Sequence, residues 1–149
     1  MTLKTYRYYC SESHLDFEFD CEGPKGKIRK IVRYRPLKTG SLSYFNLGFG
    51  DFNPKTGKID DLAVTNNQDR DKILATIAAT VMEFTSHYPD AVVYAQGSTP
   101  ARTRPYQMGI STNWPQIAPL LYVFGYEQNS GWEPFQKNAR YDAFLVKRK

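Results

Sequence analysis

The chain has 149 residues, a formal net charge of +5 and a hydrophobic fraction of 41%. A chain of this length can form one core without a disulfide or a metal ion, so we expect a single domain over residues 1–149. No run of residues approaches a membrane span, which needs about 18 apolar residues, and the first residues lack the apolar core of a signal peptide. These features predict a cytoplasmic protein with no membrane partner.

The residue types limit the chemistry that the chain can carry. Its only histidines are His14 and His87, and its two cysteines, Cys10 and Cys21, show no metal-ligand or disulfide spacing. The sequence has no phosphate-binding P-loop, no glycine-rich dinucleotide motif and no zinc pattern. We therefore predict reduced thiols and no metal site, and we exclude a histidine-rich centre.

Two strands are predicted near the N-terminus. Residues 15–22, LDFEFDCE, alternate apolar and acidic side chains, and residues 27–36, KIRKIVRYRP, form a second run after a GPKG turn. If this hairpin is symmetrical about its turn, Asp20 lies opposite Arg29 and Asp16 lies opposite Arg33.

The basic side chains of the second strand have two interpretations. Arg29, Arg33 and Arg35 share one face of the strand. We favour a solvated face whose charges pair across the hairpin, because opposite charges across a ladder commonly stabilise sheets. The alternative is a basic patch that binds an acidic protein or a nucleic acid.

The centre of the chain changes from strand to helix. Residues 41–52 and 57–64 are expected to be strands joined by the turn NPKTG. A long amphipathic helix is predicted over about residues 68–88, with Thr65 or the asparagines as its cap and Gln68 in the capping box. Pro89 ends it. The apolar stripe of this helix is Ile73, Ile77, Val81, Phe84 and Tyr88.

The rest of the chain is expected to add a central strand, short helices and a last strand. Residues 91–96 are short and apolar, as a central strand is, and Pro105 is expected to interrupt or kink the helix that follows. A second short helix is predicted over 114–124, ending at Gly125, and residues 139–149 form the closing strand. The fold class is therefore α+β, with a mostly antiparallel twisted sheet and the long helix packed on it.

The stretch GSTPARTRPYQMGI, residues 97–110, is the best candidate site. Ser98 or Thr99 is a natural N-cap before Pro100, so a helix starts here and exposes backbone N–H groups. With Arg102 and Arg104, these groups make an anion or nucleotide site.

Two other interpretations of this stretch stay open. The two arginines are two positions apart and do not share a face of a regular helix, so they could instead pair with surface carboxylates. Tyr106 is either a core aromatic or a proton donor.

Four segments carry a resemblance to a known family over nearly the whole chain: EGPKGKIRKIV, LGFGDFNPKTGKIDDLAVTNNQDRDKILATIAATV, YAQGSTPARTRPYQMGIS and GWEPF…YDAFLVKRK. They resemble an uncharacterised family of small bacterial proteins, a domain of unknown function. The resemblance implies an intracellular bacterial protein and no particular activity. With the small size and basic charge, it suggests the effector of a toxin–antitoxin-like pair, whose partner is a small protein encoded nearby.

A second resemblance concerns the order of elements between residues 59 and 110. It is similar to the acyl-CoA-binding half of GNAT-type N-acetyltransferases, which implies acyl-CoA as cofactor, Arg70 near its pyrophosphate and Tyr106 as general acid. The chain has Ile73 where the pyrophosphate turn of that family has glycine. The other matching positions are Ala75, Ala101 and Gly109.

Overall fold

The computed structural model describes residues 4–24, 26–37, 43–60 and 69–149. In this part of the chain an open, mostly antiparallel sheet of nine strands is combined with three helices, which confirms the predicted α+β class. In sheet order the strands are β1 (Tyr8–Cys10), β2 (Asp16–Gly23), β3 (Gly26–Pro36), β4 (Tyr44–Asn53), β6 (Val92–Ala95), β9 (Ala143–Arg148), β7 (Leu121–Glu127) and β8 (Gly131–Pro134), and β5 (Lys58–Asp60) pairs with β4 outside this path.

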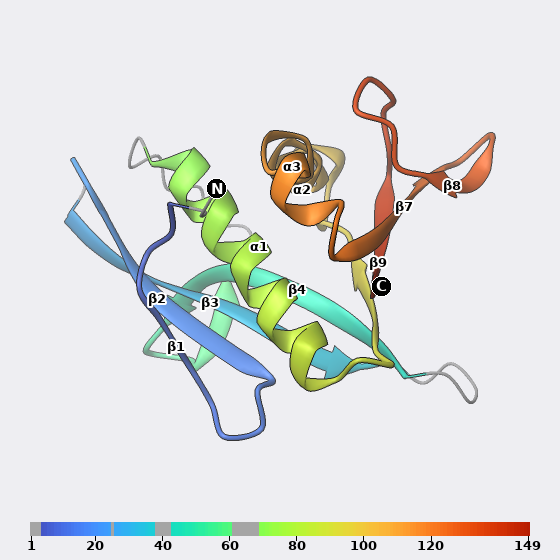
Figure 1. Cartoon of the computed structure of the whole chain (residues 1–149). Coiled ribbons are helices and arrows are strands. Elements are labelled where there is room, and N and C mark those ends of the chain that lie inside the picture. Colours follow the sequence, from blue (N-terminus) through green and yellow to red (C-terminus); the bar gives the residue numbers. More distant parts are fainter. Residues whose placement is uncertain (1–3, 25, 38–42, 61–68) are drawn as a thin grey trace.

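The helices lie on one side of the sheet (Figure 1). Helix α1 (Arg70–His87) connects β4 and β5 to β6, and it supplies the crossover that the parallel pair β4–β6 requires. Helices α2 (Pro100–Thr112) and α3 (Trp114–Ile117) lie beside α1, toward β7 and β9 (Figure 1). None of the described helices has the length and apolar character needed to cross a membrane.

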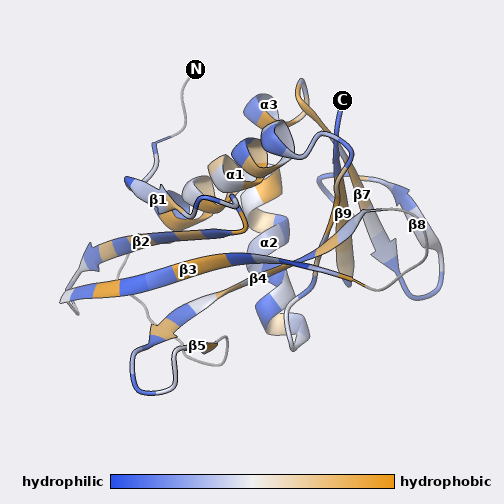
Figure 2. Cartoon of the chain, turned by 90° about the horizontal axis from the view of Figure 1, so that it is seen from below, coloured by the Kyte–Doolittle hydropathy of each residue, from blue (hydrophilic) through white to orange (hydrophobic). Residues whose placement is uncertain are grey.

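The β2–β3 hairpin has the register that its charges predict. Asp20 lies opposite Arg29, and Asp16 lies opposite Arg33. The alternation of hydrophilic and hydrophobic residues along both strands can be followed in Figure 2. Three side chains of β2 are buried on the inner face of the sheet, and they are Phe17, Phe19 and Cys21.

Helix α1 agrees with the predicted helix over about 68–88, because it runs from Arg70 to His87 and ends before Pro89. Three positions of the predicted apolar stripe are buried and two are half-buried: Ile77, Val81 and Phe84, then Ile73 and Tyr88. The predicted caps Thr65 and Gln68 lie outside the described residues.

The centre of the core joins α1 to β3 through aromatic rings. Tyr34 is fully buried, and its ring stacks on that of Phe84 with centroids 4.1 Å apart. Its hydroxyl lies 3.0 Å from Oγ1 of Thr80, which satisfies a polar group that would otherwise be costly to bury. Burial raises the pKa of Tyr34 well above its usual range.

Two parts of the second half of the chain differ from what the sequence predicts. Pro105 does not interrupt α2, which continues to Thr112, and the alternative of a kink at Pro105 stays a prediction. A proline removes one backbone hydrogen bond, and the contact of α2 with α1 offsets this loss. The helix predicted over 114–124 is only the single turn of α3, since Pro119 precedes strand β7, whose residues pair with both β8 and β9.

Candidate functional site

The candidate site is built around the junction between β6 and α2. Gly97 stands at this junction, and a Cβ atom on it would lie only 2.3 Å from the carbonyl carbon of Arg102. The hydroxyl of the buried Thr103 accepts the backbone N–H of Gly97 at 3.0 Å and donates to the carbonyl of Thr99 at 3.1 Å. Glycine is therefore required for the close turn, and Thr103 fixes the turn to the first turn of α2.

The start of α2 is the one that the sequence predicts. Thr99 is the N-cap, because its Oγ1 accepts the backbone N–H of Arg102 at 3.2 Å, and Pro100 is the first helical residue. The first turn holds no acidic side chain that would neutralise the positive end of the helix dipole. This end of the helix is thus suited to a negative charge.

Next to this helix start lies a cleft of about 780 Å³, which we call the α2 cleft. Its first wall is the start and one side of α2, and its second wall is the segment 137–142 between β8 and β9, with part of β7. The lining residues that matter for charge and capping are Ser98, Thr99, Arg104, Lys137, Arg140 and Asp142.

The second wall is held in place by Gln107 and Tyr141. Gln107 on α2 donates through Nε2 to the carbonyl of Ala139 and accepts the backbone N–H of Tyr141 at 3.2 Å. The ring of Tyr141 covers Gly125, where a Cβ atom would lie 2.4 Å from it. The Tyr141 hydroxyl donates to Glu133 at 2.7 Å, and burial, followed by this bond, raises the pKa of Tyr141.

The walls of the α2 cleft carry more positive than negative side chains. Arg104, Lys137 and Arg140 line it, and Asp142 is the one carboxylate among its described lining residues. In the described part of the chain, no carboxylate lies within 4.0 Å of the charged nitrogens of these three cations. The Oδ2 atom of Asp142 accepts the backbone N–H of Gln128 at 3.1 Å.

The structure brings together only some of the predicted site residues. Ser98, Thr99 and Arg104 line the α2 cleft, whereas Arg102 is not among its lining residues and donates through Nη1 to Thr99 Oγ1 at 3.2 Å. Tyr106 lines a separate apolar cavity of about 60 Å³ between α1, α2 and the sheet.

Arg70, the residue predicted to lie near a pyrophosphate, is the first residue of α1. Its Nη1 atom lies 4.0 Å from the sulfur of Met108 on α2. It does not belong to the lining of the α2 cleft.

Sequence reasoning missed two of the three cations that line the α2 cleft, and it missed the amide side chain that holds the second wall. Lys137 and Arg140 lie in an irregular segment near the C-terminus, and Gln107 is an ordinary helix residue by pattern. The only sequence signal was the pair of basic residues three apart in KNAR, and nothing local connects that pair to α2. The contact depends on tertiary structure.

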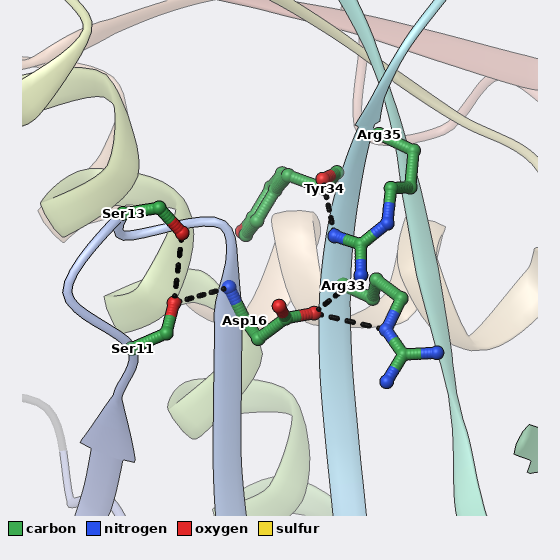
Figure 3. Close-up of polar contacts among 6 residues, drawn as sticks. All are labelled: Ser11, Ser13, Asp16, Arg33, Tyr34 and Arg35. Atoms are coloured by element: carbon green, nitrogen blue, oxygen red, sulfur yellow. Dashed lines mark hydrogen bonds and ion pairs between the residues drawn. The ribbon is translucent and has the colours of Figure 1, made fainter. Parts of the chain in front are cut away.

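The basic face of β3 follows the favoured interpretation, in which its charges pair across the hairpin. Arg29 forms a two-bond contact with Asp20 at 2.8 and 3.1 Å. Arg33 and Arg35 both contact Oδ1 of Asp16, at 2.9 and 3.0 Å (Figure 3). The Arg29 guanidinium holds the pKa of Asp20 below its usual value. These arginines are occupied by partners within the hairpin.

Comparison with known families places nearly the entire chain in one group. Residues 2–149 match the model of a family of unknown function (DUF6934). The chain belongs to this family, which confirms the resemblance to an uncharacterised domain. No curated protein and no solved structure matches the chain.

Proposed function

We propose that the chain binds a small phosphate-bearing ligand, of the nucleotide class, in the α2 cleft. The observation that carries this proposal is the presence of Arg104, Lys137 and Arg140 on the walls of one cleft, with no carboxylate partner among the described residues. Hydrogen bonds between guanidinium groups and phosphate oxygens are strong because they are charge-assisted. The uncompensated positive end of α2 adds to the same potential.

The size and the aromatic lining of the cleft favour a nucleotide over a bare phosphate ion. Small-molecule sites usually have volumes of about 300–1,000 Å³, and the α2 cleft has about 780 Å³. Tyr126 lines the cleft, and its ring centroid lies 5.2 Å from that of the exposed Trp132. Aromatic side chains beside cations are suited to stack a nucleobase.

The test is calorimetry and thermal shift with AMP, ADP, ATP, NAD, inorganic phosphate and a short RNA at fixed ionic strength. We expect at least one nucleotide to bind the wild type, and Arg104→Ala and Arg140→Ala each to weaken it about tenfold or more, the loss of a charged hydrogen bond. Arg102→Ala, on the same helix but outside the cleft lining, is the matched control and should change affinity much less.

Three results would reject the nucleotide proposal: no binding by any member of the panel, equal affinity in the Arg104 and Arg102 variants, or binding that does not weaken with salt. If a nucleotide or RNA does bind, growth arrest on expression of the chain alone would test the further idea of an effector in a two-gene system.

A second candidate function is acyl-CoA binding with acyl transfer. The observation in its favour is the order β5, α1, β6, α2, which agrees with the GNAT resemblance and puts Arg70 in the first turn of α1. Acetyl-CoA therefore belongs in the same panel. Loss of its binding in Arg70→Ala but not in Arg104→Ala would favour this candidate, and Tyr106→Phe would test the proton donor.

A further inference from the structure

A second cluster of chemically active side chains lies near the C-terminal end of α1, and none of its residues lines the α2 cleft. Cys10 ends β1, His14 lies in the turn between β1 and β2, and Glu83 lies on α1. Each offers one ligand atom, and these atoms all lie within 4.8 Å of one another. A thiol, an imidazole and a carboxylate are thus brought together from three separate parts of the fold.

The turn that carries His14 is firmly attached. The backbone N–H of Ser11 donates to the carbonyl of Asp16 at 2.9 Å, and Ser11 Oγ accepts the N–H of Asp16 at 3.2 Å, a bond drawn in Figure 3. The hydroxyl of Tyr88, just after α1, donates to the carbonyl of Ser13 at 2.6 Å. These bonds fix the turn between β2 and the end of α1.

The backbone of His14 supplies an independent observation. Its φ is +61°, and it is the one non-glycine residue of the described chain with a positive φ. Such a conformation is unfavourable for a residue with a Cβ atom, and residues held in it are concentrated at functional sites. A turn that only reversed the chain would be easier to build with glycine or asparagine.

Neighbouring groups orient two of the three donors. His14 Nδ1 lies 3.2 Å from the carbonyl oxygen of Glu12. This contact fits the tautomer that is protonated on Nδ1, in which Nε2 carries the lone pair that can bind an ion. Glu83 Oε1 accepts the hydroxyl of Tyr8 at 2.9 Å. Partners of this kind commonly hold metal ligands in one orientation.

His87 also touches the cluster, but in a different role. It follows Glu83 by one turn of α1, and its ring stacks on that of His14 with centroids 3.9 Å apart and planes at 15°. A metal ion lies in the plane of the imidazole that binds it, so two nearly parallel stacked rings do not bind the same ion. His87 therefore covers the His14 ring and is not a ligand.

We propose that Cys10 Sγ, an imidazole nitrogen of His14 and the carboxylate of Glu83 form a binding site for Zn²⁺ or a similar borderline divalent ion. Zinc accepts sulfur, nitrogen and oxygen donors in tetrahedral geometry, whereas magnesium and calcium prefer oxygen alone. Bonds from zinc to sulfur, nitrogen and oxygen are about 2.0–2.3 Å long, so the donor atoms around a tetrahedral ion are about 3.5 Å apart. Small side-chain rotations are enough to bring the three ligand atoms from their present separations to that distance.

Binding changes the protonation of the site and leaves one position open. The Cys10 thiol loses its proton to solvent on binding, because the thiolate is the ligand. The fourth coordination position is taken by water, as in sites with three protein ligands. The site is independent of the ligand proposed for the α2 cleft.

The test is titration of the full chain with Co²⁺, followed by absorption spectroscopy, and then competition for Zn²⁺ with a chromophoric chelator. We expect one ion per chain, the strong visible bands of tetrahedral Co²⁺ and a thiolate-to-cobalt band in the near ultraviolet. Cys10→Ser should remove that band. Cys10→Ser and Glu83→Gln should each weaken Zn²⁺ binding about 100-fold or more, beyond the usual effect of an outer-shell partner.

Two variants serve as matched controls. Glu12→Gln changes a neighbouring carboxylate that is outside the cluster, and His87→Ala removes the stacked ring; both should keep the cobalt spectrum and most of the affinity. In His14→Asn, the asparagine tolerates the left-handed backbone conformation, so the variant should stay folded. We expect it to lose metal binding while its circular dichroism spectrum remains that of the wild type.

Four results would overturn the assignment: only the weak bands of six-coordinate cobalt, no thiolate band, unchanged affinity in Cys10→Ser or Glu83→Gln, or full loss of binding in His87→Ala. If one of the ligand variants unfolds, the proposal can still be rejected, because the cobalt spectrum of the wild type and the two control variants test it separately.

Discussion

Gln107 accepts the backbone N–H of Tyr141 at 3.2 Å, and this bond ties the second wall of the α2 cleft to helix α2. The same side chain donates to the carbonyl of Ala139, so one amide joins two backbone positions 32 and 34 residues away. Arg140 lies between these two positions in the chain, and Lys137 precedes Ala139 by two residues. Their placement opposite Arg104 depends on a residue that carries no charge.

Removing the Gln107 amide should loosen that wall. Gln107→Leu keeps the approximate side-chain volume but removes both hydrogen bonds. We expect this change to lower the free energy of unfolding by about 1–2 kcal/mol in total. The amide of Tyr141 should exchange with solvent faster, and affinity for a cleft ligand should fall although every cation remains. Hydrogen exchange read by NMR measures the first effect. Gln116→Leu, on α3, is the control, and equal exchange at Tyr141 in both variants would contradict the role of Gln107.

The sequence was sufficient to predict the structure where the deciding interactions are between residues close in the chain. The register of the hairpin followed from two alternating strands and one turn, so the sequence predicted that Asp20 lies opposite Arg29, as the structure shows. The cap of α2 followed from Thr99 and Pro100 in the same way. These features involve residues that are close in the chain.

The sequence was not sufficient where distant segments decide the structure. Residues 121–127 are apolar enough for a helix or a strand, and their pairing with β9, about twenty residues later, selects the strand. Arg104 could be proposed for an anion site, but Lys137 and Arg140 are brought to it by Gln107 and by the packing of Tyr141 on Gly125. No local pattern encodes those contacts.

The Asp20–Arg29 pair predicts an acid-dependent contribution to stability. Because Arg29 lowers the pKa of Asp20 in the folded chain, the contribution is fully present above the unfolded value of about 4 and is lost as the pH falls through the lower folded value. Asp20→Asn should therefore be less stable than the wild type at pH 7, by less than about 1 kcal/mol because the pair is partly exposed.

Urea unfolding at a series of pH values measures this effect. The difference between the wild type and Asp20→Asn should shrink toward zero in strong acid. Asp90→Asn changes an exposed carboxylate without an ion pair in the described chain, and its difference should stay near zero throughout. If the difference in unfolding free energy between the wild type and Asp20→Asn grew in acid, the inferred direction of the Asp20 pKa shift would be wrong.

Ile77 tests the packing of α1 on the core. Its side chain is 6% exposed and borders the apolar cavity of about 60 Å³, so truncation enlarges an existing void. Ile77→Ala should reduce the unfolding free energy by about 2–4 kcal/mol. Ser86→Ala, at an exposed position of the same helix, should change it by less than about 0.5 kcal/mol. Equal thermal stability of the two variants would show that this face of α1 is not core.

Alanine substitutions at the neighbouring residues Thr99 and Ser98 test which of them caps α2 beside the cleft. Thr99 caps α2 by accepting the N–H of Arg102, while Ser98 is exposed and makes no such bond in the described chain. Thr99→Ala should cost about 1 kcal/mol of unfolding free energy, and Ser98→Ala should be nearly neutral. Because the first turn of α2 also supports Thr103 and Gly97, fraying in Thr99→Ala should weaken binding of a phosphate-bearing ligand as well. Denaturant unfolding of both variants, with and without that ligand, separates the two effects. A larger loss of stability in Ser98→Ala would reassign the cap to Ser98.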